Sequence, residues 1–75
     1  MKNFGEWLKT YLKRHNITQA SLARRSGFQA TVISAWATGR TEPRAINLII
    51  LATALSQLTG RPRGEILEHM AIAIM

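Results

Sequence analysis

The side chains best suited to bind a partner in this sequence are basic. Lys and Arg number 10 against 4 acidic residues, which gives 75 residues a formal net charge of +6. So large an excess on a short chain indicates a polyanionic partner, either nucleic acid or an anionic membrane, although a basic surface can also serve solubility alone. No run reaches the roughly 18 apolar residues of a membrane span, and the start lacks a signal-peptide pattern. We therefore expect a cytoplasmic protein with no membrane partner.

The residue types that serve catalysis or metal binding do not come together in the sequence. The chain has no Cys, which excludes a disulfide framework and a thiolate zinc site. His15 and His69 have no neighbours at metal-ligand spacing, and Thr31 and Ser34 have no base and acid to activate them. We therefore expect no enzymatic activity, no metal and no cofactor.

Apolar residues recur at helical spacing in five segments, which predicts a single all-α domain over residues 1–75. The first four helices are expected over Asn3–His15, Thr18–Ser26, Gln29–Thr38 and Arg44–Thr59. Asn3 and Thr18 are candidate N-caps, Pro43 can begin the fourth helix, and Pro62 opens the fifth. The apolar tail 71–75 is compatible with helix, strand or disorder.

Each predicted helix has an apolar face that should turn toward the core. The inward residues are Phe4, Trp7, Leu8, Tyr11 and Leu12, then Leu22 and Ala23, then Val32, Ile33 and Trp36, then Leu48, Ile49, Leu51, Ala52 and Leu55, and finally Ile66, Leu67, Met70 and Ala71.

The second and third helices form the most informative unit. A short helix ends at Gly27 and another short helix follows within about three residues, which is the helix-turn-helix pattern. Two helices that cross steeply need a small residue at their approach, here Ala23, and a glycine in the turn for a positive φ.

The chain resembles the phage Cro and repressor type of helix-turn-helix protein, also called the xenobiotic-response-element family. The resemblance spans roughly Phe4 to Leu67. It rests on an ordered set with consistent spacing: Ile17-Thr18-Gln19, Leu22-Ala23, Gly27-Phe28, Val32-Ile33-Ser34-Ala35-Trp36, Gly39-Arg40, Pro43, Leu51-Ala52 and Leu55. It implies a five-helix, lambda-repressor-like DNA-binding domain.

The resemblance also implies which residues touch double-stranded DNA. The third helix would lie in the major groove with five residues toward the base edges: Gln29, Ala30, Thr31, Ser34 and Ala35. Gln can pair with adenine, Thr and Ser can bond several bases, and Ala can touch a thymine methyl. Four residues would hold phosphates and so set position rather than sequence: Gln19, Arg40, Thr41 and Arg44.

Two departures from the family pattern affect these expectations. Many relatives carry Gln at the position of Ala30, whereas here the Gln comes one place earlier, at Gln29. Relatives also often pair an Arg of the first helix with a Glu that ends the third, where this chain has Leu12 and Ala37. Because packed apolar residues often replace a buried ion pair without loss, the fold should tolerate this exchange, with both side chains buried and close together.

Surplus apolar residues in the C-terminal third predict a homodimer. The expected interface consists of Ile46, Ile50, Met70, Ile72, Ile74 and Met75, with residues 61–75 as the dimerisation helix and tail that contribute most. A two-fold dimer would read two half-sites of a pseudo-palindromic operator.

The function expected from the sequence is that of a DNA-binding transcriptional regulator, a repressor of phage, plasmid or mobile-element type. An antitoxin with a toxin partner and a restriction-modification controller remain alternatives within the same class. A protein-interaction module that has lost DNA binding and a non-specific nucleic-acid binder are alternatives of other classes.

Overall fold

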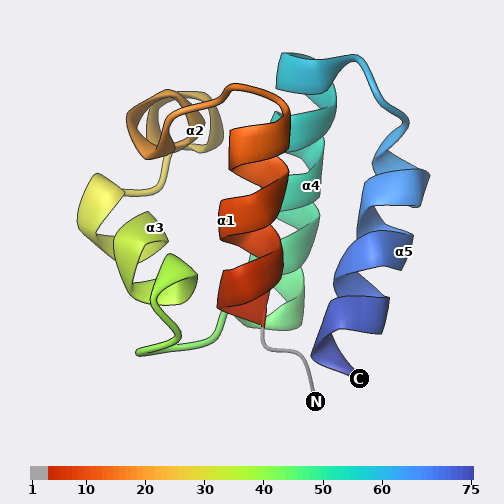
Figure 1. The fold of residues 1–75 in the computed structure, drawn as a ribbon. Helices are drawn as coiled ribbons and strands as arrows, with labels where there is room; N and C mark the ends of the chain where they lie inside the picture. The colour runs from red at the N-terminus through yellow and green to blue at the C-terminus, as the bar shows by residue number, and fades with distance from the viewer. Residues whose placement is uncertain (1–3) are drawn as a thin grey trace.

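The computed structural model describes residues 4–75 of the chain, and its regular structure is helical throughout (Figure 1). The helices are α1 (Phe4–Arg14), α2 (Gln19–Ser26), α3 (Ala30–Ala37), α4 (Ala45–Thr59) and α5 (Arg63–Ile74). This confirms the five-helix, all-α fold expected from the sequence. The tail is helical as far as Ile74, and the expected cap at Asn3 lies outside the described residues.

The helix ends follow from local capping chemistry. The hydroxyl oxygen of Thr18 accepts a hydrogen bond of 3.0 Å from the backbone N–H of Ser21, as expected for an N-cap. Gly60, with φ 78°, ends α4 in the left-handed conformation that glycine adopts without strain. The expectation that Pro43 begins α4 is wrong, because the helix starts at Ala45 with Arg44 as its N-cap.

All five helices contribute to one apolar core. Its fully buried large side chains are Leu8, Leu22, Ile33, Leu51, Leu55, Ile66 and Met70. Leu12 and Ala37 are also buried, at 4% and 1% exposure, so the prediction that both are buried is confirmed. Among the described residues, no helix has the length and apolar character needed to cross a membrane.

The inner faces of α4 and α5 differ from the sequence-based expectation at four positions. Ile49 was expected to face inward but is exposed, whereas Ala54, which was not expected in the core, is buried. Ala71 was also expected to face inward and is exposed, while Ala73 is buried. These helices are apolar on more than one face, so hydrophobic spacing alone does not identify the face that packs.

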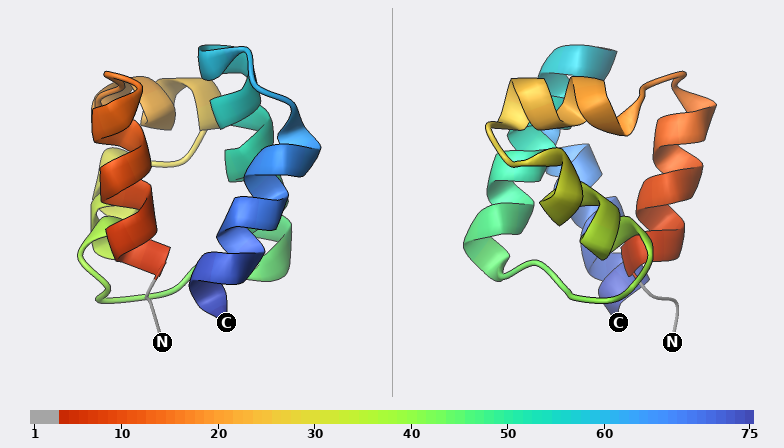
Figure 2. Two further views of the ribbon diagram at one scale, coloured as in Figure 1. Left: turned by 45° about the vertical axis from the view of Figure 1, so that its right-hand side comes forward. Right: turned by 90° about the vertical axis from the view of Figure 1, so that its left-hand side faces the viewer.

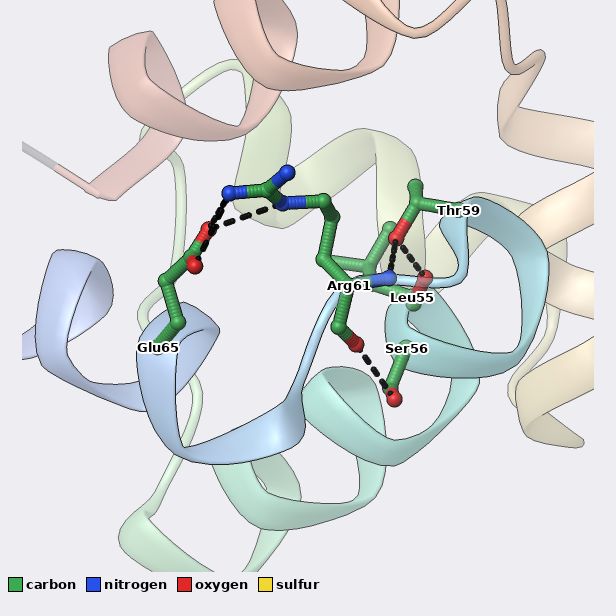
Figure 3. Close-up of polar contacts among 5 residues, drawn as sticks. All are labelled: Leu55, Ser56, Thr59, Arg61 and Glu65. Carbon is green, nitrogen blue, oxygen red and sulfur yellow. Dashed lines mark hydrogen bonds and ion pairs between the residues drawn. The ribbon is translucent and has the colours of Figure 1, made fainter.

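A tight turn joins α4 to α5 (Figure 3). The Ser56 hydroxyl donates to the carbonyl oxygen of Arg61 at 2.7 Å, and the backbone N–H of Arg61 donates to the Thr59 hydroxyl at 3.1 Å. The guanidinium of Arg61 binds both carboxylate oxygens of Glu65, at 2.9–3.0 Å. These contacts fix α5 beside α4, on the side of the molecule away from α3 (Figure 1).

Candidate nucleic-acid interface

The turn between α2 and α3 is short and well anchored. Gly27 adopts φ 87° and its N–H donates to the carbonyl of Ala23 at 2.9 Å. Phe28 follows and packs edge-on against Trp36, with ring centroids 4.9 Å apart. Because Trp36 and Ile33 are buried, α3 is held by its inner face and cannot rotate without loss of core contacts.

The outer face of α3 holds the residues that the sequence assigned to base contacts. Gln29, Ala30 and Thr31 are exposed, and Ser34 and Ala35 are half-buried. The polar side chains of Gln29, Thr31 and Ser34 make no hydrogen bond with any residue that the structure describes. Their donors and acceptors are therefore available to a ligand. Gln29 is the N-cap residue of α3, although its side chain does not cap the helix.

The connector between α3 and α4 carries the basic residues assigned to phosphates. The backbone N–H groups of Arg40 and Thr41 both donate to the carbonyl of Ala35, at 2.9 and 3.4 Å, which ties the connector to the end of α3. Arg40, Thr41 and Arg44 are exposed, and neither arginine has an acidic partner within the described chain. The connector also carries the exposed Glu42, so its formal charge is +1 (two arginines against one glutamate), and no ion pair within the described chain neutralises either arginine.

Gln19, the fourth residue assigned to a phosphate, is the first residue of α2 and is half-buried. It follows the capping Thr18, so it lies at the helix end where backbone N–H groups and the helix dipole favour an anion. Thus the structure puts Gln19 at one end of the helix-turn-helix and the basic connector beyond the other.

A second exposed surface is apolar. On α4 it consists of Ile46, Ile49 and Ile50, which lie at i, i+3 and i+4 and therefore on one face; we call them the α4 isoleucine triad. Hydrophobic spacing had placed Ile49 in the core, so the sequence identified only two of the three.

The exposed apolar side chains of α5 do not share one face. Met70 was expected at a dimer interface, but it is 1% exposed and belongs to the core, so its side chain is not available to a partner. Ile72 lines a groove of about 380 Å³ beside Trp7 of α1. Ile74 is two residues from Ile72, so it lies about 160° round the helix from it, and it is 40% exposed.

Comparison with known proteins assigns the same unit that the geometry identifies. A family model described as helix-turn-helix matches residues 8–57, which run from the middle of α1 to near the end of α4. No curated protein and no solved structure gives a significant match to the chain.

Proposed function

The chain belongs to the helix-turn-helix family of DNA-binding transcriptional regulators, and we propose that it is a repressor that binds an operator as a homodimer. The observation that carries the proposal is the pairing of an outward α3 face with free polar groups and a basic connector without internal ion pairs. A rigid helix with free donors and acceptors suits the reading of base edges, and free cations suit the binding of phosphates.

In the proposed complex α3 lies in the major groove. Gln29 and Thr31, both exposed at the start of the helix, offer hydrogen bonds to bases, and Ser34 offers another one turn later. Ala30 and Ala35 present methyl groups that suit contact with a thymine methyl. Because Gln stands at position 29 and Ala at position 30, an adenine contact at position 30 is not carried over to this chain.

Phosphate contacts would set the position of α3 in the groove. Gln19 at the start of α2 would hold one site, and Arg40, Thr41 and Arg44 of the connector would hold others. Arg44 is the N-cap of α4, and the first turn of that helix has no acidic residue to repel a phosphate.

Repression is the simplest outcome of such binding. A protein that occupies a promoter blocks polymerase without any further contact, whereas an activator also needs a surface that recruits polymerase. We propose a regulator of phage, plasmid or mobile-element type, which would act in the cytoplasm, where its DNA is.

The homodimer is proposed to form through the α4 isoleucine triad. Three isoleucines on one exposed helical face give a compact apolar patch, of a kind that normally marks an interface. The triad also begins directly after the basic connector, so a second copy docked there would sit beside the same DNA. This assignment departs from the tail-centred dimer expected from the sequence, because the side chains of the tail point in different directions.

Footprinting on the DNA that flanks the protein's own gene tests the proposal. We expect a protected site with two similar half-sites, and transcription in vitro from the adjoining promoter should fall as the site fills. Equal binding to all duplexes, or transcription that rises with occupancy, would overturn the repressor assignment.

A further inference from the structure

One edge of α1 lies against α3. Gly5, in the first turn of α1, is so close to the end of α3 that a Cβ there would stand 2.6 Å from the carbonyl oxygens of Trp36 and Ala37. Lys9 and Lys13 follow Gly5 at intervals of four residues and lie about 40° and 80° further round the helix, on its exposed side. This lysine stripe therefore starts at the edge of α1 that borders α3 and turns from it toward solvent.

Both lysines are exposed and have no hydrogen bond or ion pair with the described residues. The nearest acid along the helix, Glu6, lines the groove toward α5 with Thr10. Two other acids, Glu65 and Glu68, lie on α5. Lys9 and Lys13 are thus on a different helix from Glu65 and Glu68, and neither forms an ion pair with Glu6 or with Glu42 of the connector.

Figure 2 shows how α1 and α4 lie on either side of α3. In its right-hand view α3 lies in front, with α1 along one side and the start of α4 on the other. A major groove that receives α3 is bordered by two phosphate backbones. Arg44 caps α4 on one flank of α3, and the lysine stripe runs up the other.

We propose that Lys9 and Lys13 bind backbone phosphates on the α1 flank of α3, so that the duplex is held from both sides of the recognition helix. The inference rests on the proposed placement of α3 in the major groove. Four residues of helix rise about 6 Å, close to the roughly 6.8 Å that two phosphate steps rise along one DNA strand, so the two ammonium groups can serve phosphates two steps apart. Neither lysine reads a base, and both act on every sequence alike.

The salt dependence of binding to a mixed-sequence duplex tests this inference. Lys9→Ala and Lys13→Ala should each flatten the slope of log affinity against log salt by about one unit, and the double variant by about two. Lys13→Arg keeps the positive charge and should therefore show the wild-type slope. The matched control is Arg63→Ala, which removes the same charge from α5, on the far side of the molecule from α3. Its slope should equal that of the wild type.

The inference is wrong if the two lysine variants show the same salt dependence as the wild type. It is also wrong if the Arg63→Ala control flattens the slope as much as the lysine variants do. The proposed function has a separate criterion in the same assay. If Arg40→Ala and Arg44→Ala flatten the slope while the lysine variants do not, α3 still occupies the groove and only the α1 flank is wrongly assigned. If no variant changes the slope, both proposals fail.

Discussion

Gly5 of α1 lies directly against the carbonyl oxygen of Ala37, the last residue of α3, and a Cβ on Gly5 would stand 2.6 Å from that oxygen. The close approach lets the first turn of α1 support the end of the proposed recognition helix. Leu12, about two turns further along α1, and Ala37 belong to the same core. These are the positions where the family often has an ion pair. Backbone contact and apolar packing thus take the place of a charged link.

Gly5→Ala should destabilise the protein, because the added methyl group meets backbone atoms that cannot move freely. Overpacking of this kind costs about 1–3 kcal/mol. Gly64→Ala is the control, since Gly64 lies within α5 with nothing within 4 Å of its Cβ position. Thermal unfolding of both variants makes the comparison, and equal effects would show that Gly5 tolerates a side chain.

Leu12→Ala should lower the free energy of unfolding by about 2–5 kcal/mol, the usual cost of a cavity at a fully buried leucine. Ile72→Ala removes comparable apolar volume from a side chain that is 66% exposed, and should change stability by less than about 0.5 kcal/mol. Urea unfolding measures both. A small loss at Leu12 would mean that the core does not depend on the residue that replaces the family's arginine.

Tyr11→Phe should stabilise the protein. The Tyr11 hydroxyl is buried and has no hydrogen-bond partner among the described residues. A buried polar group without a partner costs about 1–3 kcal/mol, so its removal should raise the free energy of unfolding by about 1 kcal/mol. Denaturant unfolding measures whether the free energy of unfolding rises or falls. A clear fall would show that the hydroxyl is hydrogen-bonded in solution.

Ile46→Glu should dissociate the proposed homodimer, because it places a charge within the α4 isoleucine triad. Ile72→Glu is a matched control: the two isoleucines are 60% and 66% exposed, and Ile72 faces the groove beside α1. Sedimentation equilibrium at micromolar concentration compares the variants with the wild type. If only Ile72→Glu dissociates the dimer, the interface lies on α5 and not on the α4 isoleucine triad. A monomeric wild type would exclude the dimer.

The helix-turn-helix could be predicted from the sequence because its local signals agree. Thr18 caps one helix, Gly27 supplies the left-handed turn, and the buried Ile33 and Trp36 fix the inner face of α3. Once the inner face of α3 is fixed, helical geometry predicts which of its residues are exposed.

The surfaces of α4 and α5 could not be predicted in the same way. Ile46, Ile49 and Ile50 are as apolar as the buried Leu51, so sequence pattern alone does not separate the inner face of α4 from its outer face. Likewise, a glycine at position 5 suggests a close approach but does not identify its partner. Both features depend on tertiary packing.

Selection from a random duplex library tests most directly the central claim that α3 reads bases while the connector holds phosphates. The wild type should enrich one motif. Gln29→Ala or Thr31→Ala should change the preferred base at particular positions, by about 1–3 kcal/mol each, whereas Arg40→Ala and Arg44→Ala should keep the motif and weaken all sequences alike. A motif altered by the arginine variants and untouched by the α3 variants would contradict the account.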